Sequence, residues 1–448
     1  MSGPRPGGKG GRGGPRRSGG RRRGRPGADA ALEEARPESA PAQPPVDAPV
    51  VVLTRGGVRR LGSGHPWLFP AQIEVGSVRD GELVRLEGPA GHARGHAVLS
   101  AGSRIPLRVV GRGAPAGDDA PDLDAADPDA WWRARLDAAV RRRAEALAVG
   151  EEACRWVHAE ADGLPGLVVD RFGSVAVLQA GCRWADRRAE AVAEHLVEHH
   201  GLTGVLARHD GPFRKLDGLE EGVRVLAGEV PEVVGWEHGG LRREVRPWHG
   251  QKTGAYLDQR ENQRWAATVL PVGEALDAFC HDGGFGLHLA AAGSRVEALD
   301  SSETALERVA AHAAANGLEE RLLPRAVNVF EDLRDRVAAR EQKDAVVLDP
   351  PALAKRRGDL PSALRAYKEL NLRALRLLRP GGRLVSCSCS FHLGREDLLG
   401  ALRSAAADAG LAVQLLEMRG AAACHPRLLT HPESDYLKVV LVEVVGRG

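Results

Sequence analysis

The chain has 448 residues, of which 43% are hydrophobic and 4% aromatic, and its formal net charge is +2. This length needs more than one hydrophobic core, so we expect two or three domains. The sequence has no apolar run of about 18 residues that could span a membrane. It also has no apolar segment of a secretory signal, and its six cysteines are scattered, unlike a disulfide framework. We therefore expect a cytoplasmic protein with no membrane partner.

The first 49 residues differ in composition from the rest of the chain. Residues 1–27 consist mainly of Gly, Arg and Pro and carry nine Lys or Arg and no acidic residue. Such a segment cannot form a core, so residues 1–49 are predicted to be a disordered tail. Arginines spaced by glycines suit loose contact with RNA phosphates. A passive, solubilising extension is the alternative.

Two domains of mixed character are predicted to follow the tail. Short apolar runs punctuated by glycines indicate a small β-rich domain over residues 50–112. After a polar linker, a helix begins at Asp129 and has an apolar face. A hairpin turning at residues 170–173, a helix over residues 184–200 and a further strand complete a central α+β domain over residues 126–236. The apolar face of the first helix consists of Trp132, Leu136, Ala139 and Leu147.

Residues 237–448 change to a regular alternation of strands and helices. After a hairpin at residues 238–240, apolar strands are predicted at residues 274–280, 296–300, 344–349 and 383–390. Amphipathic helices are predicted between them, at residues 286–293, 305–317 and 360–378. Nearly continuous apolar strands that alternate with helices predict an α/β fold with a doubly wound, Rossmann-like sheet.

The turn after the first of these strands reads "DAFCHDGGFG". Gly284 and Gly286 lack the third glycine of the dinucleotide pattern, because Leu289 stands in its place. The next strand ends in Asp300, a carboxylate placed to accept hydrogen bonds from both hydroxyls of a ribose. Together with Asp277, these features suggest a binding site for S-adenosylmethionine. A plain tight turn, and Asp300 as a helix cap, are the alternatives.

The stretch "VVLDPPALAK" places Asp349 at the end of a buried strand. The two prolines stop the strand and stiffen the loop that follows. The carboxylate then faces the pocket above the sheet and can accept a hydrogen bond from an amine on a base. Leu353 lies where amino-directed methyltransferases carry an aromatic residue close after the prolines. A simple strand terminator is the alternative.

The stretch "LVSCSCSF" places Cys387 and Cys389 on one face of the last predicted strand. Carbon 5 of a pyrimidine needs activation before it can accept a methyl group, and a thiolate that adds to C6 provides it. Cys389 lies nearer the carboxyl end of the strand, where the pocket of such a sheet opens. The alternative is that each cysteine is a small, buried hydrophobic side chain in the core. A metal site with His392 lacks a fourth ligand, and a disulfide between the two would be strained, so we expect no metal.

With these motifs in place, the chain resembles the bacterial large-subunit rRNA cytosine-C5 methyltransferases. Proteins of that family join a PUA domain, a central domain and an S-adenosylmethionine-dependent catalytic domain. The matching stretches are "HPWLF", "ADGLPGLVVDRFG", "GQKTGAYLDQREN", "DAFCHDGGF", "ALDSS", "LDPPALAK", "YKELNLRALRLLRPGG" and "SCSCS". They extend over residues 50–445, so only the tail lies outside the resemblance.

The resemblance implies 5-methylcytosine formation in 23S rRNA and assigns roles to individual residues. Cys389 would be the nucleophile and Asp349 would face the target base. The resemblance implies a PUA-like domain at residues 50–112 and a catalytic domain at residues 237–448. A second copy of the chain is a further candidate partner. The implied cofactor-binding residues are Gln251, Thr253, Asp258, Asp277, Gly283, Gly284, Asp300, Ser301, Asn328 and Asp349.

Two departures from the family and two other functions bear on this interpretation. His281 and Asp282 replace a usual Tyr-Thr pair, which adds a carboxylate near the cofactor turn. Leu353 replaces a common Phe, so no aromatic side chain is available at this position to stack on the target base.

Two other functions are alternatives. Methylation of guanine N7 or of an exocyclic amine would keep Asp349 but would not need Cys389. A non-catalytic RNA-binding assembly factor would not need the acids at all.

Deletion of residues 1–27 is expected to weaken RNA binding mainly at low salt. The nine basic residues of this segment release counterions when they contact phosphates, so their loss should flatten the dependence of log K on log salt. Filter binding of rRNA across a salt series measures this slope. An identical slope with and without the segment would make it a passive extension.

Overall fold

The computed structural model describes residues 49–74, 80–113, 127–147, 151–211, 213–249 and 253–448. These residues fall within one compact unit, Asp47–Gly448. The predicted tail (apart from Pro49), most of the predicted linker before Asp129, and Gln251 lie outside the described residues. No helix within the described ranges is long and apolar enough to cross a membrane.

The first domain is a six-stranded sheet with strand order β2-β6-β5-β4-β1-β3. Strand β1 pairs parallel with β4 and antiparallel with β3. The sheet carries the expected β character and closes around a small apolar core. Its strands are β1 (Val50–Leu53), β2 (Trp67–Leu68), β3 (Ile73–Glu74), β4 (Leu83–Glu87), β5 (Ala93–Leu99) and β6 (Leu107–Arg112).

One helix of this domain, α2 (Arg55–Gly62), was not expected from the sequence. Its two glycines at positions 56 and 57 look like loop punctuation. Thr54 nevertheless caps the helix, because its hydroxyl accepts a hydrogen bond from the Gly57 N–H at 3.2 Å. A Cβ at Gly57 would lie 2.2 Å from the Gln72 carbonyl oxygen. The glycine there permits close packing against residue 72 and does not break the helix.

The central domain is a five-stranded sheet with order β11-β10-β9-β8-β7. The predicted hairpin is confirmed as β8 and β9, but its turn lies at residues 173–174, and Asp170 is buried within β8. The expected helix over residues 184–200 is two helices that meet at Arg188. The elements are α3 (Ala130–Ala146), β7 (Ala153–His158), β8 (Leu167–Phe172), β9 (Val175–Ala180), α4 (Arg183–Arg187), α5 (Ala189–His200), β10 (Gly204–His209), α6 (Phe213–Leu216) and β11 (Gly222–Gly228).

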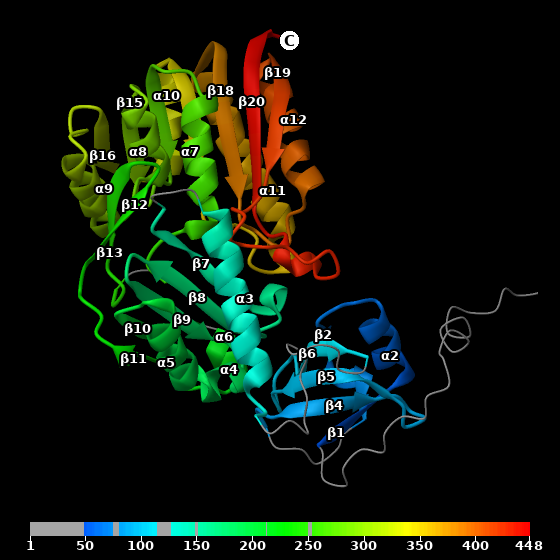
Figure 1. The fold of residues 1–448 in the computed structure, drawn as a ribbon. Coiled ribbons are helices and arrows are strands. Elements are labelled where there is room, and N and C mark those ends of the chain that lie inside the picture. The colour runs from blue at the N-terminus through cyan, green and yellow to red at the C-terminus, as the bar shows by residue number, and fades with distance from the viewer. Residues whose placement is uncertain (1–48, 75–79, 114–126, 148–150, 212, 250–252) are drawn as a thin grey trace, which may run out of the picture. The chain divides into compact units, whose positions relative to one another are not determined.

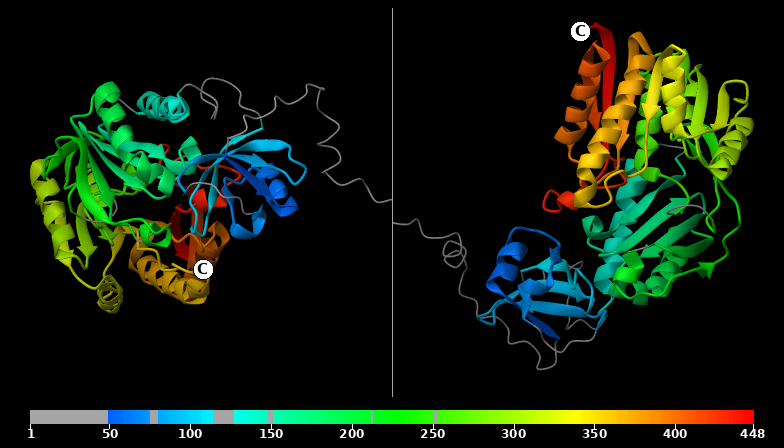
Figure 2. Two further views of the ribbon diagram at one scale, coloured as in Figure 1. Left: turned by 90° about the horizontal axis from the view of Figure 1, so that it is seen from below. Right: turned by 180° about the vertical axis from the view of Figure 1, so that it is seen from behind.

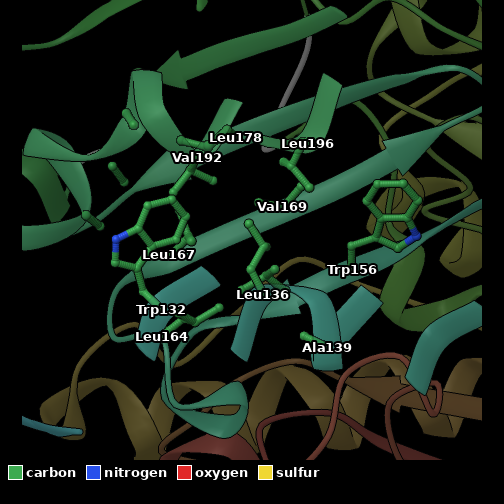
Figure 3. Packing of buried hydrophobic residues seen from close by; sticks show 14 of the residues in the cluster. Trp132, Leu136, Ala139, Trp156, Leu164, Leu167, Val169, Leu178, Val192 and Leu196 are labelled. Carbon is green, nitrogen blue, oxygen red and sulfur yellow. The ribbon is translucent and has the colours of Figure 1, made fainter. Parts of the chain in front are cut away.

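The predicted apolar face of α3 forms part of the core of this domain. Trp132, Leu136 and Ala139 are almost fully buried, and Leu147 packs against the same cluster from just beyond the helix. Figure 3 shows these α3 side chains together with residues of β8, β9 and α5. Asp137, on the same helix, accepts hydrogen bonds at 2.7 Å from His195 and His200 of α5. Apolar packing and these polar contacts both join α3 to α5.

The third domain contains a seven-stranded sheet with order β16-β15-β14-β17-β18-β20-β19. All neighbouring pairs are parallel except the two that β20 makes. The hairpin β12–β13 precedes it, and the expected boundary between residues 236 and 237 falls inside β12. The strands are β12 (Val234–His238), β13 (Leu241–Val245), β14 (Glu274–Ala278), β15 (Arg295–Asp300), β16 (Leu322–Ala326), β17 (Lys343–Leu348), β18 (Leu378–Ser388), β19 (Leu411–Arg419) and β20 (Lys438–Arg447).

Helices cover both faces of this sheet, as the alternating pattern predicts (Figures 1 and 2). One core lies between the strands and three helices, α7, α8 and α9. A second core lies on the opposite face, beneath α10, α11 and α12. The fold is therefore doubly wound. The helices are α7 (Arg260–Val269), α8 (Gly284–Ala291), α9 (Glu303–Ala315), α10 (Val329–Ala338), α11 (Leu360–Leu377) and α12 (Arg395–Ala409).

Strand β18 differs from its expected limits at both ends. It begins at Leu378, before the Pro-Gly-Gly sequence, and a shift in its pairing with β17 accommodates that sequence. It ends at Ser388, whereas the sequence predicted a strand to Ser390. Cys387 is therefore a strand residue and Cys389 is not.

Leu136→Ala is expected to lower the free energy of unfolding by about 2–5 kcal/mol. Leu136 is 0% exposed at the centre of the α3 face, so truncation leaves a cavity that the sheet cannot close. Urea denaturation measures the change. Arg141→Ala, at an exposed position of the same helix, is the control and should change the value by less than about 0.5 kcal/mol. Equal losses in the two variants would contradict the packing argument.

Candidate active site

Three loops meet where the strand order of the large sheet reverses. From β14 the chain moves outward to β15 and β16, then returns to β17 on the other side of β14. A reversal of this kind leaves a crevice at the carboxyl ends of the strands. The Asp349 N–H donates to the Ala278 carbonyl at 3.2 Å and joins the ends of β17 and β14. The loops after β14, β17 and β18 therefore open onto one crevice.

The loop after β14 has a strained backbone. Phe279 and His281 adopt positive φ values of 65° and 50°, and Gly283 has φ of 78°. Left-handed conformations at two non-glycine residues are costly, and they concentrate at functional sites. Gly284 begins α8, and a Cβ on it would lie 2.3 Å from the Gln263 amide nitrogen. The glycine turn is thus tightly packed, with backbone N–H groups at the start of a helix.

Asp277 lies beneath this turn and is 1% exposed. Its Oδ2 accepts a hydrogen bond from the Gly286 N–H at 2.8 Å. Its Oδ1 is buried and has no hydrogen-bond partner within the described residues. Burial, with the nearby carboxylates of Asp349, Asp282 and Asp300, raises the pKa of Asp277 to about 7. A buried acceptor of this kind favours a ligand that brings a positive charge or a donor.

Asp300 ends β15 and lies half-exposed beside the same turn. One of its oxygens accepts from the His281 N–H at 2.9 Å, and the other from the Ser302 N–H at 3.0 Å. The cap of α9 is Ser302, whose hydroxyl accepts from the Ala305 N–H. Asp300 is therefore not the helix cap itself, and its carboxylate is held at the rim of the crevice by backbone donors.

The additional carboxylate of Asp282 has a partner of its own. Although burial opposes ionisation, the Arg243 guanidinium holds the pKa of Asp282 well below its usual range. The Arg243 Nη2 and the Asp282 Oδ2 are 2.7 Å apart, and both side chains are buried. Arg243 lies on β13, so the hairpin before the sheet neutralises the carboxylate that departs from the family pattern.

Asp349 follows β17 at the centre of the crevice. Its Oδ2 accepts a hydrogen bond from the Gln259 side-chain amide at 3.1 Å. The Asn262 amide in turn donates to the Gln259 oxygen at 2.7 Å, which fixes the orientation of that amide. Leu353, beyond the prolines, packs against the core under α10–α12. The Asp349 carboxylate is thus oriented from α7, and the loop after it offers no aromatic side chain.

The two cysteines of "SCSC" lie in different environments. Cys387 is 0% exposed and packs in the core beneath α7–α9, and burial raises its pKa well above the usual range. Cys389 is half-buried directly beyond the end of β18, on the same face. Lys438 of β20 secures the next residue, because its ammonium donates to the Ser390 carbonyl at 2.6 Å. Only Cys389 combines a place at the crevice edge with partial exposure.

Comparison with known proteins agrees with this geometry. The chain is 32% identical over 401 residues to ribosomal RNA large subunit methyltransferase I of Pseudoalteromonas atlantica, covering 88% of this chain and 99% of that protein. The protein of the same name from Aeromonas hydrophila is 33% identical over 399 residues, covering 88% and 98%. The chain belongs to the ribosomal RNA large subunit methyltransferase I family.

The domain matches fit this family assignment. Residues 51–112 match the PUA-like domain, and residues 215–419 match the S-adenosylmethionine-dependent methyltransferases. A solved structure from Streptococcus mutans, proposed to be a SAM-dependent methyltransferase, has a TM-score of 0.73 at 16% identity. The alignment covers 88% of this chain and 100% of that one, which supports the fold. S-adenosylmethionine is the cofactor of this methyltransferase. The buried Asp277 Oδ1, which has no hydrogen-bond partner in the described part of the chain, fits the cationic amino acid end of this cofactor.

Of the other expected cofactor residues, two have side chains that are hydrogen-bonded within the protein and two are exposed. Thr253 donates its hydroxyl to Asp170 of β8 at 2.6 Å. Asp258 accepts from the Tyr436 hydroxyl at 2.7 Å. Asn328 caps α10 and is exposed, and Ser301 is exposed just after β15. The structure thus brings Asp277, Asp300 and the glycine turn together, while the side chains of Thr253 and Asp258 are held by residues distant in sequence.

Three polar residues of the site were not identified from the sequence. Gln259 lies in "GQKTGAYLDQREN", next to the expected cofactor residue Asp258, and its side chain contacts Asp349. Arg243 and Lys438 contact their partners across 39 and 48 residues of chain. The surrounding sequence gave no signal for Arg243. A lysine inside the apolar run "YLKVVLVEVV" was a usable signal, because a buried lysine needs acceptors.

Asp277→Asn is expected to stabilise the cofactor-free protein increasingly between about pH 4 and pH 7. The pKa of Asp277 is raised from 3.8 to about 7, so the folded state binds this proton more tightly than the unfolded state does. Stability from this group is present at low pH and is lost as the pH rises through 7. Asparagine cannot ionise, so the variant avoids a cost that reaches roughly 4 kcal/mol above pH 7.

Urea denaturation of the cofactor-free protein at several pH values measures this difference. Glu303→Gln, at an exposed position at the start of α9, is the control and should follow the wild type at every pH. A difference between Asp277→Asn and the wild type that does not change with pH would contradict the buried, protonated carboxyl.

Proposed function

We propose that this methyltransferase forms 5-methylcytosine in 23S rRNA, in the cytoplasm, with Cys389 as the nucleophile. The observation that carries the proposal is the position of Cys389. It is the half-exposed cysteine immediately beyond β18, next to the strand that ends at Asp349, whereas Cys387 is buried in the core. The relatives are ribosomal RNA large subunit methyltransferases, which supports the large-subunit rRNA as the substrate. Chemistry at carbon 5 is the reaction that requires such a thiol.

In this reaction the crevice would supply the nucleophile and the group that recognises the base. The Cys389 thiolate forms a bond from Sγ to C6 of the cytosine, which places an electron pair on C5. The Asp349 carboxyl, oriented by Gln259, hydrogen-bonds the N3 and N4 side of the base and favours this addition. The bound cofactor supplies an electrophilic methyl group on its sulfonium. After C5 has accepted that methyl, a general base takes up the C5 proton, and the electron pair of that C–H bond re-forms the C5–C6 double bond. The bond from C6 to Sγ breaks at the same time and releases the Cys389 thiolate.

The acids and the glycine turn would hold the cofactor. Asp277 offers a buried oxygen that no described residue contacts through a hydrogen bond, and Asp300 offers a carboxylate at the rim that is suited to ribose hydroxyls. Gly283 and Gly284 let the backbone approach the ligand closely. We also propose that the following residues bind the cofactor: Gln251, Thr253, Asp258, Ser301 and Asn328.

The other functions differ in what they require of these residues. Methylation of guanine N7 or of an exocyclic amine would use Asp349 but would not require the Cys389 thiol. A non-catalytic assembly factor has no use for the buried Asp277 or for a strained cofactor loop. A homodimer is compatible with each of these functions and does not discriminate among them.

Cys389→Ala is expected to abolish methylation of 23S rRNA, and Cys387→Ala to retain much of it. The first variant removes the nucleophile and the second a buried packing group. Transfer of labelled methyl groups, with mapping of 5-methylcytosine in the product, measures the effect. Thermal stabilisation by S-adenosylmethionine should be equal in the two variants and shows that each one is folded.

A mechanism-based probe separates the candidate reactions. With 5-fluorocytosine at the target, C5 has no proton to lose, so the enzyme should remain covalently attached to the RNA. The adduct should form with the wild type and Cys387→Ala and be absent with Cys389→Ala. Full activity in Cys389→Ala would exclude the C5 reaction and favour guanine N7 or an exocyclic amine. Loss confined to Cys387→Ala would keep the reaction but move the nucleophile.

A further inference from the structure

Phe391 is the only exposed Phe, Trp or Tyr among the side chains whose burial the structure describes. It is 47% exposed in a chain that has only seven phenylalanines, and it lies two residues beyond Cys389. The His392 ring packs against it edge-on, with ring centres 5.0 Å apart. Even with this contact, the Phe391 ring leaves an exposed apolar surface at this edge of the sheet.

The ring lines an open cavity of about 730 Å³ between the loop after β18 and the segment that precedes β20. Arg395, Arg427 and Lys438 also line this cavity, together with one carboxylate, Asp435. Both arginines bond to that carboxylate, at 3.1 and 2.8 Å, and remain 34% and 45% exposed. Three cations and one acid give the cavity an excess of positive charge. An apolar ring among exposed guanidinium groups matches a single nucleic acid strand.

The loop that follows Asp349 offers no aromatic side chain for stacking. Leu353 occupies the position after the prolines and packs into the core. Asp349 can recognise the hydrogen-bonding edge of a base, but a carboxylate does not support the flat face of that base. A base drawn out of its own stack loses contacts on both faces, and an aromatic side chain can replace one of them. Phe391 is the exposed aromatic nearest in sequence to the proposed nucleophile.

We propose that Phe391 is a stacking platform for a base of the unpaired substrate RNA strand, with Arg395 and Arg427 holding the adjoining phosphates. The inference rests on the part of the proposed function that makes rRNA the substrate, and it does not depend on which atom is methylated. The strand enters through the cavity and reaches the thiol from the side of the loop after β18. Stacking tolerates any base, so Phe391 contributes affinity and alignment, and the edge contacts at Asp349 contribute selectivity.

Phe391→Leu and Phe391→Trp test the platform. Leucine keeps an apolar side chain of similar size but has no aromatic face, and tryptophan enlarges that face. The dissociation constant is measured by filter binding of an unmodified 23S rRNA fragment, and separately of oligocytidylate, without cofactor. Phe391→Leu is expected to weaken binding roughly 5- to 50-fold, and Phe391→Trp to bind as well as the wild type. The matched control is Leu416→Ala, an apolar side chain on β19 with 42% exposure.

The outcomes decide between stacking and other roles. Equal affinity of Phe391→Leu and the wild type would overturn the proposal, as would equal weakening in the leucine and tryptophan variants. Arg395→Gln with Arg427→Gln should lower the slope of log K against log salt by roughly 1 to 2; an unchanged slope would remove these arginines from the strand path. Because no methyl transfer is measured, a failure of the C5 reaction does not affect this result.

Discussion

The parallel pairing of β14 with β17 is the constraint on which the site depends. These strands are separated by β15, β16 and three helices in sequence, yet they lie side by side, and the Asp349 N–H bonds to the Ala278 carbonyl. The pairing places the carboxyl end of the strand that carries Asp277 beside the carboxyl end of the strand that precedes Asp349. β18 adds the cysteine loop to the same edge through its own parallel pairing with β17. Backbone hydrogen bonds between these strands thus hold Asp277, Asp349 and the cysteine loop at one edge of the sheet.

Buried charged groups are a second feature of the structure. The side chains of Asp282, Glu151 and Lys438 are each buried, and each has a close partner that lies far away in sequence. Arg243 bonds to Asp282, while Arg260 and His238 both contact Glu151. The Lys438 ammonium donates to the carbonyls of Ser390 and Tyr436. Asp277 differs from these groups, because one of its oxygens has no partner within the described residues. This contrast is the reason for proposing Asp277 as a cofactor-binding residue.

The sequence predicted the features that are encoded locally. The Asp-Pro-Pro strand end, the glycine turn, the apolar face of α3 and the shared face of the two cysteines follow from short-range periodicity and turn chemistry. Helix α2 escaped prediction because its Gly57 is required by a contact with Gln72, which no local pattern reveals. The partners Arg243 and Gln259 escaped for a related reason: they meet Asp282 and Asp349 only after folding, across 39 and 90 residues of chain.

The position of β20 in the sheet has a consequence for how the protein becomes an enzyme during synthesis. Every residue proposed to act on cofactor or base precedes Lys438 in the chain, yet β20 lies inside the sheet, between β18 and β19. A nascent chain that has left the ribosome as far as α12 thus carries a complete set of reactive groups without the ammonium that fastens the cysteine loop. The thiol loop acquires its anchor only when the last strand is inserted. During translation the proposed nucleophile therefore lacks this hydrogen bond until β20 joins the sheet.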